Sequence, residues 1–142
     1  MKCLYLQGLT HFYSWEYDIV TNLVNGMQQI LNYINGEFLE SASEKWLDNY
    51  NPSNGEVYSQ LPKSNAEDVA LAVESAKRAF PKWSKISITD RGALLQRISE
   101  SILDNLEILV KAESKDNGKP ERLARAVDIP RAASNFKFYS QA

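Results

Sequence analysis

The chain has 142 residues, which is enough for one domain or for part of a larger one. Its 16 basic and 18 acidic residues give a net charge of −2, and 44% hydrophobic and 11% aromatic residues are typical of a globular chain. This composition excludes a disordered polyelectrolyte and gives no sign of a nucleic-acid-binding protein.

Cysteine and histidine are scarce. The chain has one cysteine, Cys3, and one histidine, His11. A disulfide within the chain is therefore impossible, and a zinc cluster of cysteine and histidine is nearly excluded. No thiol or imidazole follows residue 11, which excludes Ser-His-Asp and Cys-His catalysis from the body of the chain.

Residues 1–26 differ from the rest of the chain. Polar residues interrupt their apolar pattern, so they resemble neither a signal peptide nor a membrane span, which needs about 18 apolar residues in a row. We expect these residues to be an N-terminal extension outside the fold, with strand and helix signals beginning at Ile30. We also expect a cytoplasmic protein with no membrane partner.

Two β-hairpins are predicted next. The segments Leu31–Ile34 and Glu37–Leu39 flank an Asn-Gly pair, the dipeptide most typical of a two-residue hairpin turn. Trp46–Tyr50 and Val57–Leu61 flank the turn sequence NPSNG, in which proline presets one backbone angle and Asn-Gly favours left-handed angles.

Helical patterns follow the hairpins. Ser64 and Glu67 have the spacing of a capping box, and the apolar pattern after them ends at Pro81. A single longer helix is predicted from Thr89 to the glycine and proline of the DNGKP sequence at residues 116–120. The expected fold is therefore α/β, with two β-hairpins followed by three or more helices.

The third helical pattern starts near Pro120 and is kinked or restarted at Pro130. It still presents Phe136, Phe138 and Tyr139 where the sequence stops, which suggests a chain that has been cut short. Not every large apolar residue of these helices can be buried by the predicted elements alone. Those concerned are Leu94, Ile98, Ile102, Leu106, Val127, Phe136 and Tyr139.

The DNGKP sequence is first of all a helix stop, because glycine takes the left-handed position after a helix and proline prevents its continuation. A functional alternative is that Asp116 supplies oxygen to a hard cation together with backbone carbonyls near Asn49. The sequence has no glycine-rich phosphate loop of known spacing.

Five motifs, in their order along the chain, resemble the N-terminal portion of the NAD(P)-dependent aldehyde dehydrogenase superfamily. They are YINGEF at 33–38, NPSNGEV at 51–57, A-x-x-AFP-x-W at 76–83, Arg91 before Leu94-Leu95, and DNGKP at 116–120. The segment 124–139 is similar to the branch that acts on 2-aminomuconate or 2-hydroxymuconate semialdehyde. The resemblance runs from Met27 to Ala142, so residues 27–142 are expected to be part of a cofactor and oligomerisation domain.

The resemblance implies an enzyme that oxidises an aldehyde to the carboxylic acid with NAD as cofactor. In that family the catalytic cysteine, the general-base glutamate and the Rossmann strands come later than the segment matched here. We therefore expect this chain alone to be inactive and to bind no NAD, and to associate as a homo-oligomer or with the remainder of the enzyme. The resemblance also implies a monovalent-cation site with the Asp116 carboxylate and backbone oxygens of Asn49 and Tyr50.

Two other functions stay open at this point. The chain could be a non-enzymatic interaction module that docks on a full-length relative, or a gene fragment without function. The sequence does not give the aldehyde substrate, and it does not distinguish NAD from NADP.

Overall fold

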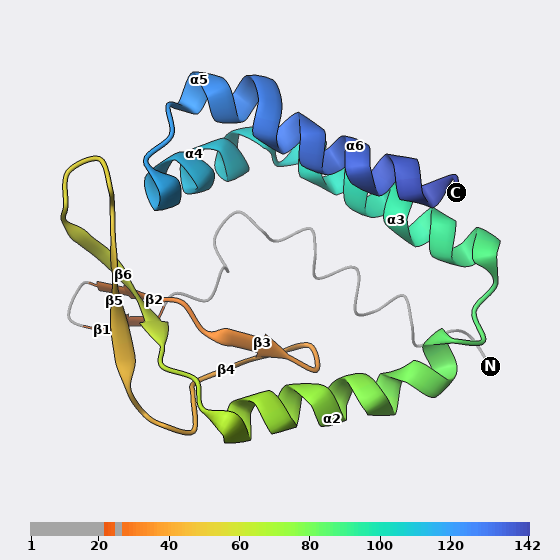
Figure 1. Cartoon of the computed structure of the whole chain (residues 1–142), viewed down its shortest axis with the longest axis horizontal. Helices are drawn as coiled ribbons and strands as arrows, with labels where there is room; N and C mark the ends of the chain where they lie inside the picture. The colour runs from red at the N-terminus through yellow and green to blue at the C-terminus, as the bar shows by residue number, and fades with distance from the viewer. Residues whose placement is uncertain (1–21, 25–26) are drawn as a thin grey trace. The chain divides into compact units, whose positions relative to one another are not determined.

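The computed structural model describes residues 22–24 and 27–142, which form two compact units (Figure 1). The strand unit holds residues 22–24, 27–49 and 57–80, and the helical unit holds residues 50–56 and 81–142. Cys3, His11 and most of the predicted N-terminal extension lie outside the described residues.

The first predicted hairpin is confirmed. Strands β3 (Asn32–Ile34) and β4 (Glu37–Leu39) pair antiparallel, with Ile34 opposite Glu37. Asn35 and Gly36 both have positive φ, 58° and 85°, as a type I′ turn requires. The rings of Tyr33 and Phe38 lie opposite each other across the strands with centroids 4.9 Å apart, so an aromatic pair supports the register set by the turn.

The second predicted hairpin is also confirmed, as strands β5 (Trp46–Tyr50) and β6 (Val57–Pro62). They are neighbours in a four-stranded sheet of order β1-β2-β6-β5. Backbone hydrogen bonds from Lys63 to Lys45 and from Asn51 to Glu56 close the two ends of this ribbon. From one end of the ribbon to the other the residue numbers of the bonded partners rise along β5 and fall along β6, which is the pattern of an antiparallel pair.

The other two strands of this sheet were missed from the sequence. Strand β1 (Asn22–Val24) pairs antiparallel with β2 (Met27–Gln29), and β2 pairs parallel with β6. Strand signals therefore begin before Ile30, and the expectation that they begin there was wrong. The usable signal was a further Asn-Gly dipeptide, at residues 25–26 of the sequence, between these short strands.

Helix α2 (Ala66–Trp83) begins one residue later than the predicted capping box implies. The Asn65 side chain accepts hydrogen bonds from the backbone N–H groups of Glu67 and Asp68, and the Asp68 carboxylate accepts the N–H of Asn65 in return. The reciprocal pair is thus Asn65 with Asp68 and not Ser64 with Glu67. Pro81 does not end the helix, because a proline in the last turn removes one hydrogen bond without preventing two further helical residues.

The predicted helix over residues 89–118 is two helices, α3 (Ile88–Asp104) and α4 (Leu106–Asn117). The break lies at Asn105, whose side chain donates to the carbonyl of Ser101 and so occupies an acceptor at the end of α3. The apolar pattern continues across the break and gave no sign of it. The predicted stop is confirmed, because Gly118 is left-handed with φ 74° and closes α4.

The last helical region starts with one turn, α5 (Glu121–Leu123), and continues through the π-helical segment η2 (Ala124–Asp128) into α6 (Ile129–Ser140). The predicted irregularity at Pro130 is therefore confirmed and takes the form of a wider turn just before the proline. A proline lacks the N–H that would bond to the preceding turn, so a locally wider helix accommodates it. Helices α3 and α6 pack along each other (Figure 1).

The apolar core lies in the helical unit. Val110, Ala124 and Ile129 form its centre, and Ile102, Leu106 and Leu109 pack around them. In the described part of the strand unit the buried residues are polar: Gln29, Ser41, Ser59 and Asp68. Of the seven apolar residues expected to compete for burial, Ile98, Val127, Phe136 and Tyr139 are exposed.

The turn 50–56 contacts the end of α4 within the helical unit. A Cβ built on Gly118 would lie 3.1 Å from the Cβ of Pro52, closer than ordinary van der Waals contact. Glycine is therefore required at position 118 for two reasons: the positive φ, and the lack of room for a Cβ beside Pro52.

We expect Gly118→Ala to destabilise the helical unit more than Gly55→Ala. Both glycines have φ of 74°, so both variants pay about 1 kcal/mol or more of left-handed strain. A Cβ at Gly55 meets no atom within 4 Å, whereas a Cβ at Gly118 meets Pro52. Urea unfolding followed by circular dichroism measures the difference, and equal losses in the two variants would show that the Pro52 contact is unimportant.

The exposed apolar residues predict that the isolated chain binds hydrophobic dyes and self-associates. Each large apolar side chain left in water forgoes roughly 1.5–3 kcal/mol, against a domain stability of about 5–15 kcal/mol. Dye fluorescence and the concentration dependence of thermal unfolding test this expectation. A sharp transition that is independent of concentration, from a monomer with little dye binding, would contradict it.

Candidate functional site

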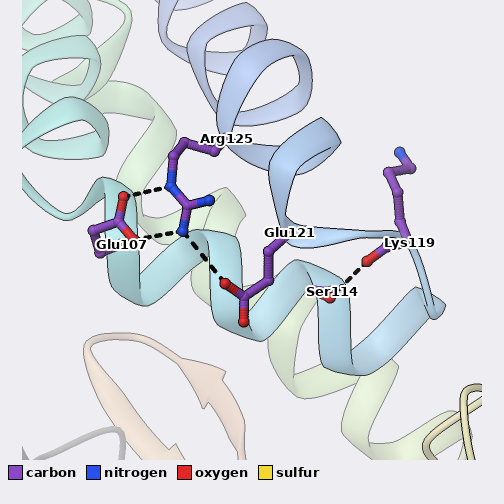
Figure 2. A network of polar contacts seen from close by, with 5 residues as sticks. All are labelled: Glu107, Ser114, Lys119, Glu121 and Arg125. Atoms are coloured by element: carbon purple, nitrogen blue, oxygen red, sulfur yellow. Dashed lines mark hydrogen bonds and ion pairs between the residues drawn. The ribbon is translucent and has the colours of Figure 1, made fainter.

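The richest polar cluster of the helical unit joins α4 to the segment that follows it (Figure 2). Arg125, on η2, donates through Nε and Nη2 to the two carboxylate oxygens of Glu107 on α4, each at 2.7 Å. The same Nη2 donates to Glu121 at 3.3 Å. This paired geometry fixes one face of η2 against α4, because the planar guanidinium matches both oxygens of a carboxylate.

The charges of this cluster reinforce one another. Hydrogen bonding from Arg125 lowers the pKa of Glu107, and the two glutamates raise the pKa of Arg125, with Glu107 contributing most. The folded structure therefore favours the charged forms of Glu107 and Arg125. The side chains of Arg125 and both glutamates are between 39% and 58% exposed, so the cluster has the properties of a surface ion-pair network and not of a catalytic acid and base.

Two further contacts hold the DNGKP turn. The hydroxyl of Ser114 donates to the carbonyl of Lys119 at 2.6 Å (Figure 2), and the Lys119 ammonium contacts the Asp128 carboxylate at 2.6 Å. The N–H of Gly118 donates to the Ser114 carbonyl, as expected after a left-handed helix end. The turn that the sequence identified as a helix stop is thus built as one.

The candidate cation ligands lie at the ends of two elements. Tyr50 is the last residue of β5, and Asp116 lies in the last turn of α4. Within the helical unit, Pro52 and Gly118 lie against each other. Tyr50 is two residues before Pro52 and Asp116 is two residues before Gly118, so the segments that carry these two candidates meet there.

Asn49, the third candidate, belongs to the strand unit. Its side-chain amide donates to the Tyr58 hydroxyl and to Ser59, which is fully buried. The side chain of Asn49 therefore joins β5 to β6, and the cation hypothesis concerns only its backbone oxygen. The described residues contain no group of three or more His, Cys, Asp or Glu side chains that could hold a metal ion.

The buried carboxylate of the strand unit belongs to Asp68. It accepts hydrogen bonds from the Ser41 hydroxyl at 2.6 Å, the N–H of Ala42 at 2.9 Å and the N–H of Asn65 at 2.8 Å. These donors lower its pKa, with Ser41 contributing most. A carboxylate held in its charged form by such donors is suited to closing a loop onto a helix start, and it is a poor proton acceptor.

A pocket of about 320 Å³ lies between α3 and α6. Trp83, Leu95 and Tyr139 supply apolar walls, and Arg91 supplies its one cationic group. Gly92 and Ser140 also line it, and there the two helices approach so closely that a Cβ on Gly92 would lie 2.5 Å from the Ser140 carbonyl oxygen. The pocket holds no nucleophile with an adjacent base, so its geometry indicates packing and not chemistry.

Known proteins resemble this chain over most of its length. The aldehyde dehydrogenase family matches residues 38–142. A 2-aminomuconic semialdehyde dehydrogenase of Bos taurus is 47% identical over 115 residues, 81% of this chain and 23% of that protein. A 2-hydroxymuconic semialdehyde dehydrogenase of Pseudomonas sp. strain CF600 is 36% identical over 115 residues, 80% of this chain and 24% of that protein.

The solved structures agree. PnpE, in a structure solved in complex with nicotinamide adenine dinucleotide, superposes with a TM-score of 0.77 at 35% identity. That match covers 78% of this chain and 23% of the PnpE chain. The structure of PnpE from Pseudomonas sp. WBC-3 superposes with a TM-score of 0.78 at 35% identity. The α/β class expected from the sequence is therefore confirmed.

The chain belongs to the aldehyde dehydrogenase family. It spans about 23% of the length of the curated relative that it matches at 47% identity, and this part corresponds to the N-terminal segment recognised from its five motifs. Over the described residues, no helix is both long enough and apolar enough to cross a bilayer.

Glu107→Gln is expected to reduce the loss of stability on acidification. The pKa of Glu107 is lowered in the folded state, so its ion pair contributes above the unfolded value of about 4.3 and is lost as pH falls through the folded value. The variant lacks this contribution and should unfold more easily at neutral pH, with a smaller further change below about pH 4.

Glu74→Gln is the matched control, because Glu74 forms a single exposed pair with Lys77. Urea midpoints at neutral and acid pH measure both variants. The interpretation fails if Glu107→Gln and Glu74→Gln have the same pH dependence.

Proposed function

We propose that this chain supplies the N-terminal segment of an NAD-dependent aldehyde dehydrogenase that oxidises a muconate-type semialdehyde to the corresponding acid. The observation that carries the proposal is the 47% identity over 115 residues to a 2-aminomuconic semialdehyde dehydrogenase. The similarity to PnpE, solved with nicotinamide adenine dinucleotide, supports NAD as the cofactor of the complete enzyme.

The role proposed for this segment is structural. Its one cysteine, Cys3, precedes the residues matched by the family, so the segment brings no candidate for the thiol nucleophile. The ion pairs of Arg125 and the packing of α3 on α6 would instead hold a rigid surface for the rest of the enzyme. By itself the chain is proposed to bind no NAD.

The proposal includes three properties of the complete enzyme. It would be cytoplasmic and would work as a homo-oligomer, as the family resemblance implies. It would also hold a monovalent cation with the Asp116 carboxylate and the backbone oxygens of Asn49 and Tyr50. The contact between Pro52 and Gly118 supports the last point, because it joins the segments that carry Tyr50 and Asp116.

Grafting tests the proposed function. The matched 115-residue segment of the bovine relative is replaced by the corresponding segment of this chain, and NADH production is measured with 2-aminomuconate semialdehyde. We expect the chimera to be active, since the two segments are 47% identical and packed interiors tolerate substitutions that keep volume and apolar pattern. The same chimera with Asp116→Asn is expected to keep its fold and to lose stabilisation by added monovalent cation.

The isolated chain is the negative control and should produce no NADH with any aldehyde. Activity of the isolated chain that disappears in Cys3→Ser would refute the structural role. A soluble, folded chimera without activity would refute the assignment to this branch of the family.

A further inference from the structure

Asn-Gly pairs are the sequences at which proteins most readily lose a side-chain amide. The backbone nitrogen of the glycine attacks Cγ of the asparagine, the amide nitrogen leaves as ammonia, and water then opens the cyclic imide to aspartate or isoaspartate. The reaction needs a glycine nitrogen that is free to attack and a carboxamide that is free to turn toward it. This chain has four Asn-Gly pairs, of which the structure describes those at Asn35, Asn54 and Asn117.

All three of the described asparagines are exposed, so access of water does not distinguish them. Their hydrogen bonds, however, differ from one site to the next. At Asn54 the side-chain amide donates to the Glu56 carboxylate at 2.7 Å, and its oxygen accepts the N–H of Glu56 at 3.1 Å. The N–H of Gly55 donates to the Asn51 carbonyl at 2.8 Å, so both the carboxamide and the attacking nitrogen are engaged.

Asn117 is held in the same way at the end of α4. Its amide donates to Glu113 at 2.6 Å, and its oxygen accepts the N–H of Lys119 at 2.8 Å. The N–H of Gly118 donates to the Ser114 carbonyl at 2.9 Å. Attack at this site would break the bond that closes the helix.

Asn35 differs in each respect. Among the described residues, its side chain has a single and long hydrogen bond, 3.3 Å, which its oxygen accepts from the Ser75 hydroxyl. The N–H of Gly36 donates to no described residue, because a two-residue turn leaves the pairing to the flanking residues Ile34 and Glu37. A Cβ on Gly36 would approach no atom more closely than 4.0 Å, so the turn is also sterically open.

We propose that Asn35 is the principal deamidation site among the three Asn-Gly pairs that the structure describes. The product matters for the fold, since isoaspartate inserts an extra atom into the main chain at a turn that sets the register of β3 and β4. Aspartate at this position would instead add a negative charge two residues from Glu37.

Peptide mapping by mass spectrometry tests the proposal on the full chain. The chain is kept in mildly alkaline buffer at body temperature, and fragment spectra assign the amide loss to each asparagine over time. Asn35 should convert at least about fivefold faster than Asn54 or Asn117, the factor that one net hydrogen bond contributes to an equilibrium. In strong denaturant the three rates should become similar, because the neighbouring glycine is then the same at each site.

Glu56→Ala supplies a matched variant, since it removes the acceptor of the Asn54 amide and leaves the β3–β4 turn untouched. Its Asn54 should convert faster than in the parent chain, while its Asn35 rate serves as the internal control. The proposal is overturned if Asn54 or Asn117 converts as fast as Asn35 in the native buffer. It is equally overturned if the preference for Asn35 persists unchanged in denaturant.

Discussion

The described structure depends on the hydrogen bonds and ion pairs that hold the ends of its helices and turns in place. The Asp68 carboxylate joins the loop at Ser41 and Ala42 to the start of α2, and every buried residue described in the strand unit is polar. Arg125 performs the corresponding task in the helical unit, where it joins η2 to Glu107. Local geometry is thus fixed by directional contacts, while the buried apolar residues of the described chain are few: Val110, Ala124, Ile129 and Ala133.

This balance fits the place of the segment in its family. A chain that spans about 23% of a relative's length carries apolar faces such as those of Val69, Val73 and Phe80 on α2 without burying them. In a segment built this way the caps and turns preserve the fold locally, and the exposed apolar residues are available for packing elsewhere. The same feature supports the structural role that we propose for this segment.

The candidate sites were predictable to different degrees. The sequence identified Asp116 with Asn117 and Gly118 as a helix stop, and the left-handed Gly118 confirms that interpretation. The cation hypothesis for Asn49, Tyr50 and Asp116 came from the family resemblance and stays a prediction. The Glu107 and Arg125 pair was not anticipated, because the partners are 18 residues apart and lie on different elements, α4 and η2.

The sequence by itself determined those features that depend on residues close together along the chain. Asn-Gly between short strands defined the β3–β4 hairpin, and glycine followed by proline ended the helix at Gly118. The division into α3 and α4 and the parallel pairing of β2 with β6 were decided only by the tertiary structure. Apolar periodicity is the same on both sides of Asn105, so it gives no sign of the break. The three-residue strand β2 gains its parallel partner only when β6, some 30 residues later, lies beside it.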